Sequence, residues 1–216
     1  MKVLVFFGAL LISIRPVFAQ SEKVPTSFLV LNGSYSYFNA EQQLPDRSFT
    51  NRRLGYLQAS YMAELSERNL FGIHTAWQEA TNDLHTLSAG INTLHLERTR
   101  FLELGLVYRR QRKFLKEKLV VFMQANADAV FAKQRGQAAG LDYSINGSGA
   151  RLQVRPGFDF VVNKNTAIEF GFGRADVLFM QWPETLSNGA SGNSLDFGLN
   201  TNFNLSSVFI GLKLGL

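Results

Sequence analysis

Histidine, serine and acidic residues are the first candidates for chemistry in this sequence. The chain has three histidines: His74, His85 and His95. The segment LHTLS places His85 three residues before Ser88, and Glu97 follows closely, so these residue types could form a hydrolytic trio. Such a trio is recognised by its geometry, and no nucleophile motif accompanies this one. His85 and His95 are also a conceivable metal-binding pair, but we assign no catalytic, cofactor-binding or metal-binding residue.

A basic run provides a second candidate site. RRQRK at residues 109–113 suits contact with an acidic partner, with peptidoglycan or with lipid headgroups. The formal charge of the chain is only +5, which argues against a nucleic-acid partner. Cysteine is absent, which excludes disulfides, thiolate zinc sites and cysteine nucleophiles.

A third group of charged residues alternates with apolar residues, so that each charge shares one face of a strand with Gly, Gln or Asn. The members are Glu64, Glu103, Arg109, Asp128, Arg151, Arg155, Asp159 and Glu169. If this face lines a narrow interior, each charge must be paired and hydrogen-bonded. We therefore predict a network in which Arg151 and Arg155, on one strand, bridge carboxylates on the neighbouring strands. This network is either a packed polar core or part of an ion path.

The elements that carry these residues are strands, because the dominant period of hydrophobicity is two. Hydrophobic residues make up 46% of the 216 residues, and they are spread along eight alternating segments. The segments lie near residues 26–39, 52–65, 69–81, 102–109, 119–131, 149–162, 166–173 and 206–216. His74 falls on the polar face of the third segment.

The connections are of two kinds. Short ones near residues 65–69, 112–117 and 163–165 alternate with longer polar stretches near residues 39–52, 80–97, 134–148 and 181–194. Short turns interleaved with long loops are typical of an up-and-down barrel with different surroundings at its two ends. We predict an all-β fold: an eight-stranded antiparallel transmembrane β-barrel with short periplasmic turns and four longer extracellular loops, His85 and His95 lying in the second loop.

Alternation alone does not say which face is inside, since a secreted soluble barrel has its apolar face inward. The polar face here is rich in Gly and carries charges of both signs, which suits a packed interior. Aromatic residues near the segment ends suit an interfacial girdle. These are Tyr35, Tyr37, Tyr61, Trp77, Tyr108 and Trp182. We therefore predict that the apolar face is outside and meets lipid.

The final segment, DFGLNTNFNLSSVFIGLKLGL at residues 196–216, resembles the last strand of small outer-membrane β-barrels of the OmpA/OmpX-like kind, particularly the "outer membrane protein beta-barrel domain" proteins of Bacteroidetes. The resemblance covers the mature chain in outline. It implies that the barrel assembly machinery reads this strand, which pairs with the first strand to close the barrel. Members of the group usually end on an aromatic residue, whereas this chain ends on Leu216.

The first residues have the pattern of a secretory signal peptide. Lys2 precedes an apolar run from Val3 to Ile14, and Val17-Phe18-Ala19 forms a small-residue cleavage pattern. The run is too short for the roughly 20 residues of a spanning helix. We predict cleavage after Ala19, so that residues 1–19 are the signal peptide and residues 20–216 are the barrel.

These observations predict a bacterial outer-membrane protein with a structural or surface-interaction role and a closed polar interior. The alternatives are a small channel for ions or solutes and, third, a lipid-modifying enzyme. The expected partners are outer-membrane lipid, lipopolysaccharide, the barrel assembly machinery and an extracellular ligand of the loops. We expect a monomer with no cofactor.

Overall fold

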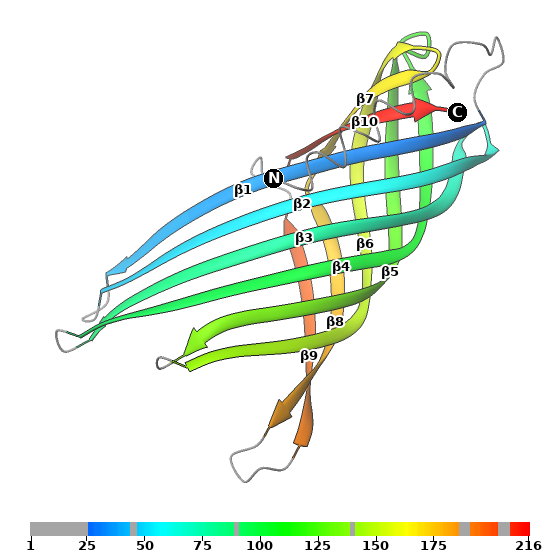
Figure 1. The fold of residues 1–216 in the computed structure, drawn as a ribbon. Coiled ribbons are helices and arrows are strands. Elements are labelled where there is room, and N and C mark those ends of the chain that lie inside the picture. The colour runs from blue at the N-terminus through cyan, green and yellow to red at the C-terminus, as the bar shows by residue number, and fades with distance from the viewer. Residues whose placement is uncertain (1–25, 44–46, 89–90, 139–140, 186–190, 203–207) are drawn as a thin grey trace.

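The computed structural model describes residues 26–43, 47–88, 91–138, 141–185, 191–202 and 208–216 (Figure 1). Regular structure in these ranges consists of β-strands, and no helix there is long and apolar enough to span a membrane. The strands are β1 (Ser27–Gln43), β2 (Arg47–Ser66), β3 (Asn69–Ser88), β4 (Ile91–Phe114), β5 (Leu119–Ala138), β6 (Leu141–Asn163), β7 (Thr166–Phe172), β8 (Arg174–Thr185), β9 (Ser191–Asn202) and β10 (Val208–Gly215). The predicted signal peptide, residues 1–19, lies outside the described residues.

Eight strands form a closed antiparallel ring, as predicted (Figure 1). Strands β1 to β6 pair in sequence order, β6 pairs with β7, β7 with β10, and β10 with β1. The closing pair runs from Phe28 opposite Gly215 to Gly33 opposite Ile210. The first and last strands therefore complete the wall. We call the end of the ring that carries the connections β2–β3, β4–β5 and β6–β7 the short-turn end.

Strands β8 and β9 extend the sheet away from the short-turn end, because β8 pairs with β6 and β9 pairs with β8. Gly173 separates β7 from β8 and has a φ of 63°, which glycine adopts without a Cβ penalty. This extra residue reverses the alternation: Phe170 precedes it on the outer face, and Val177 follows it there. Trp182 consequently lies on the inner face, against our prediction that it belongs to an exterior girdle.

The stretches predicted as four longer loops are largely strand. The described strands end at Gln43, Ser88, Ala138 and Thr185, and the next strands begin at Arg47, Ile91, Leu141 and Ser191. His85 therefore lies in β3, where it pairs with Leu94 of β4. Polar hairpins can continue a ladder of backbone hydrogen bonds without an apolar face, so a loss of alternation did not mark the strand ends.

The apolar face is outside and the polar face is inside. Leu106 and Leu152 on the outer face are 50% and 62% exposed, whereas Arg109, Gln124 and Asp159 on the inner face are fully buried. This is the inverse of a soluble barrel. Along the last strand, Ile210 and Leu216 are exposed and Phe209 and Lys213 are buried, as predicted.

Candidate functional site: the charged lumen

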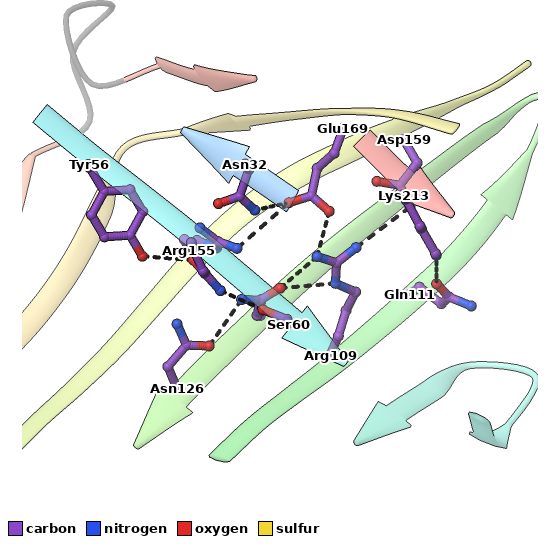
Figure 2. A network of polar contacts seen from close by, with 12 residues as sticks. Asn32, Tyr56, Ser60, Arg109, Gln111, Asn126, Arg155, Asp159, Glu169 and Lys213 are labelled. Atoms are coloured by element: carbon purple, nitrogen blue, oxygen red, sulfur yellow. Dashed lines mark hydrogen bonds and ion pairs between the residues drawn. The ribbon is translucent and has the colours of Figure 1, made fainter. Parts of the chain in front are cut away.

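A network of ion pairs around Arg109 crosses the lumen near the short-turn end (Figure 2). Arg109 Nη2 on β4 donates to Glu169 Oε2 on β7 and to Gln124 Oε1 on β5, each at 2.6 Å. Arg109 Nη1 lies 3.6 Å from Asp159 Oδ2 on β6. The guanidinium of Arg109, which is fully buried, therefore joins β4 to three other strands.

Lys213 extends the network to the last strand. Its Nζ donates to Asp159 Oδ2 at 3.1 Å and to Gln111 Oε1 at 3.3 Å. Asn32 Nδ2 on β1 donates to Glu169 Oε1 at 2.9 Å. The strands that close the ring are thus joined by side chains in the lumen as well as by the backbone ladder.

A second cluster lies farther from the short-turn end. Arg151 Nη1 donates to Glu103 Oε1, and Arg151 Nε lies 3.8 Å from Asp176 Oδ2. His74 Nε2 and Asp128 Oδ1 share a hydrogen bond, and both side chains are fully buried. A buried charge is costly unless it is paired, so these contacts offset part of the cost of burying the four charged side chains and His74.

Aromatic rings pack against the lumen cations. The guanidinium of Arg109 lies 3.9 Å from the ring centroid of Phe122, and Arg155 lies 4.3 Å from that of Phe209. Lys213 Nζ lies 4.5 Å from the ring centroid of Phe28. The negative faces of these rings attract the cations while their bulk fills the lumen.

Apolar side chains fill the lumen on either side of the charges. One buried cluster comprises Val30, Met62, Leu70 and Val107, with Phe28 packed against it. The other comprises Val130, Ala132 and Met180, with Phe101, Leu178 and Trp182 packed against it. The lumen is therefore packed, as expected for a ring of eight strands.

The predicted inward charges are placed as expected, with one exception. Glu103, Arg109, Asp128, Arg151, Arg155, Asp159 and Glu169 are all buried. Arg151 and Arg155 contact carboxylates on other strands, since Arg155 Nη2 lies 3.6 Å from Glu169 Oε1. Glu64 is only partly buried, because it lies beside the bulge that ends the pairing of β2 with β3.

The hydrolytic trio remains untested, because the side chains of His85 and Ser88 lie outside the described residues, as do those of His95 and Tyr37. Its third member, Glu97 on β4, accepts a hydrogen bond from Thr99 Oγ1 at 3.5 Å. The inward histidine, His74, follows the prediction for its face, and its Nδ1 has no hydrogen-bond partner among the described residues. No group of three potential metal ligands occurs in the part of the chain that the structure describes.

Sequence reasoning missed Asp176, Gln124 and Asn32 as members of the network. Asp176 was hidden because Gly173 reverses the alternation ahead of it. Gln124 and Asn32 were missed because neutral amides carry no signal that distinguishes a network member from a solvated residue. Lys213 was likewise not among the predicted inward charges, although its single charge on an apolar strand was an available signal.

Comparisons with known proteins place the fold. No family model and no curated protein matches the sequence. Among solved structures, the outer membrane protein OprG from Pseudomonas aeruginosa aligns over 89% of this chain and 96% of its own, with 9% identity and a TM-score of 0.53.

Two weaker matches are of the same kind. A major outer membrane protein from Thermus thermophilus has 11% identity and a TM-score of 0.46, covering 88% of this chain and 99% of that one. Neisserial surface protein A has 10% identity and a TM-score of 0.40, covering 90% and 100%. The chain has the all-β, up-and-down fold of small outer-membrane barrels.

Proposed function

We propose that this protein is a bacterial outer-membrane β-barrel with a structural or surface-interaction role and a lumen closed to solutes. Its exposed apolar exterior suits hydrocarbon, and the pairing of Phe28–Gly33 with Ile210–Gly215 satisfies the backbone of the closing strands over that stretch. The predicted signal peptide at residues 1–19 would direct export. Outer-membrane lipid, lipopolysaccharide and the barrel assembly machinery are the proposed partners, with an extracellular ligand at the far end and a monomeric barrel.

The observation that carries the closed lumen is the network centred on Arg109. It joins β1, β4, β5, β6, β7 and β10 through buried contacts, so a solute path would have to break several ion pairs at once. A lumen crossed by these ion pairs suits a structural role better than a channel. Ions or solutes would pass through it only if the network around Arg109 rearranged.

Two measurements test this proposal. The protein extracted from the outer-membrane fraction should migrate faster on a detergent gel before boiling than after it, because a closed barrel resists the detergent. Refolded protein in a planar bilayer should produce no conductance steps above the lipid background. A single unshifted band from a soluble fraction would contradict the membrane barrel, and stepwise currents would contradict the closed lumen.

The second candidate is a small channel. Arg155 Nε, Arg109 Nη1 and Asp159 Oδ1 are buried without hydrogen-bond partners among the described residues, so the network has spare donors and acceptors with which to rearrange. A cavity of about 190 Å³ at the short-turn end is lined in part by Lys113, Asp159 and Lys213. Currents in the unmodified protein that change with Lys213→Met would favour this candidate.

A lipid-modifying enzyme is the third candidate, and we infer that the protein is not one. The candidate serine and histidine, Ser88 and His85, are accompanied by no nucleophile motif in the sequence. Lipid profiles of a deletion strain should match those of its parent. A lost acyl or headgroup modification, restored by the wild-type gene but not by His85→Ala or Ser88→Ala variants, would contradict this.

A further inference from the structure

Four cations lie together on the outer face of the barrel, two on each of two paired strands. Arg98 and Arg100 on β4 pair in register with Arg135 and Lys133 on β5. All four side chains are exposed and share the face of Leu102 and of its register partner. We call Arg98, Arg100, Lys133 and Arg135 the exterior cationic patch.

Among the described residues, Lys133 and Arg135 form no ion pair with a carboxylate, although the exposed Asp142 lies on the same face of β6, opposite Gln137. Glu79 on β3 accepts a hydrogen bond from Arg100 Nε at 2.9 Å and another from Arg98 Nη2. On the other side, the residues opposite Lys133 and Arg135 on β6 are Asn146 and Ser144, which carry no charge. One carboxylate thus serves two of the four cations.

Like charges at directly opposite positions of an antiparallel pair are destabilising. Here such a pairing occurs twice in succession, at Arg98 with Arg135 and at Arg100 with Lys133. This arrangement does not stabilise the folded barrel, whereas a bound anion would reduce the repulsion between the paired cations. The side chains of Asn146 and Ser144, both exposed, add neutral hydrogen-bonding groups beside the cations.

The position of the patch indicates the kind of anion. Leu102 follows Arg100 by two residues on β4, toward the short-turn end, and so lies on the same outer face. It pairs with Trp77 on β3 and with Phe131 on β5, which puts the three residues in a single register row. Tryptophan and phenylalanine in such a row mark the border of an apolar belt. The cations therefore begin where acyl chains end and lipid headgroups lie.

We propose that the exterior cationic patch binds the phosphate groups of a lipid headgroup in the outer leaflet, an inference that rests on the proposed outer-membrane location. Arginine forks match phosphate oxygens in pairs, and Lys133 adds a point charge beside them. The acyl chains of the same lipid would lie along Leu102 and Phe131. A soluble polyanion would need no apolar row beneath the cations, so the geometry favours a lipid.

The test compares two charge-neutralised variants of the full-length barrel in detergent micelles. K133Q/R135Q removes the half of the patch that lacks a carboxylate partner. K116Q/K118Q removes two exposed lysines of the connection between β4 and β5 at the short-turn end and is the matched control. Binding of diphosphorylated lipid A and of its dephosphorylated analogue is measured by native mass spectrometry, at several salt concentrations, for the wild type and both variants.

Wild-type protein should bind the phosphorylated lipid A, and K133Q/R135Q should bind it about 10- to 30-fold more weakly, with a shallower salt dependence. K116Q/K118Q should bind the phosphorylated lipid A as tightly as the wild type does, and the dephosphorylated lipid should bind weakly to all three proteins, so that the loss requires both the patch and the phosphate. Since repulsion is relieved, K133Q/R135Q should unfold at the same or a higher temperature, which excludes misfolding as the cause.

Three results would overturn the proposal. Equal losses of lipid A binding in K133Q/R135Q and K116Q/K118Q would mean that the lipid is attracted to positive charge in general. Equal binding of the dephosphorylated lipid would remove phosphate as the ligand. Displacement of the lipid from the wild type by a soluble sulfated polysaccharide at lower concentration would identify a soluble polyanion as the partner. None of these results bears on whether the lumen conducts.

Discussion

The lumen and the exterior cationic patch use the same residue types in opposite ways. In the lumen, Arg109, Arg151 and Lys213 each contact carboxylates and are almost entirely buried. On the patch, Lys133 and Arg135 face other cations across the ladder and are exposed. Burial makes an unpaired charge costly, so inward cations must be satisfied within the protein. Exposure removes that requirement, so outward cations can remain available for an external anion.

Removing a central lumen cation should have the largest effect. Arg109→Ala leaves Glu169 and Asp159 without their shared partner, which should lower the free energy of unfolding by about 3 to 5 kcal/mol. Urea unfolding of the folded barrel in micelles measures this. The exposed counterpart Arg98→Ala should change stability by about 1 kcal/mol or less. Similar losses in both variants would refute the distinction between the two regions.

Placing a charge on the apolar exterior should come next. Leu106→Arg introduces a cation into the middle of the outer face, where a barrel in lipid loses about 2 to 4 kcal/mol. The variant should show a smaller fraction of fast-migrating, unboiled protein after refolding into bilayers. Leu106→Ala keeps the site apolar and should refold normally. Tolerance of the arginine would mean that this face does not meet hydrocarbon.

A glycine between the two lumen clusters allows a third test. A Cβ on Gly105 would overlap the carbonyl oxygen of Ala127 and Asp128 Oδ1. Gly105→Ala should therefore cost about 1 to 3 kcal/mol and displace Asp128 from His74. Gly55→Ala is the control, because no atom lies within 4 Å of its added Cβ. Equal free energies of unfolding in urea for Gly105→Ala and Gly55→Ala would show that the lumen accommodates the added Cβ without cost.

The smallest effect on stability should come from the carboxylate of the patch. Glu79→Gln removes the acid that Arg98 and Arg100 share, and exposed pairs of this kind contribute about 1 kcal/mol or less. The same change frees both arginines, so binding of diphosphorylated lipid A should become a few-fold tighter. Weaker binding in native mass spectrometry would mean that Glu79 positions the arginines for the ligand.

Much of the fold followed from the sequence because alternation reports directly on the two faces of a strand. The ring of eight, the closing of β10 on β1 and the inward position of seven charged residues were all predicted. Strand ends were not, because polar hairpins such as that of β3 and β4 carry no alternation. Trp182 was misplaced because Gly173 shifts the alternation by one residue, and a single glycine does not reveal its φ in the sequence.

The sequence by itself determined which side chains share a face, since neighbours two apart along a strand always do. Only the tertiary structure decided which of them meet. Arg109 and Glu169 are sixty positions apart, and their contact depends on the curvature that brings β4 and β7 together across the lumen. The pairing of Arg98 with Arg135 depends equally on a register set by the connection between β4 and β5. Alternation is a local property of the backbone, whereas partners are fixed by ring closure and register.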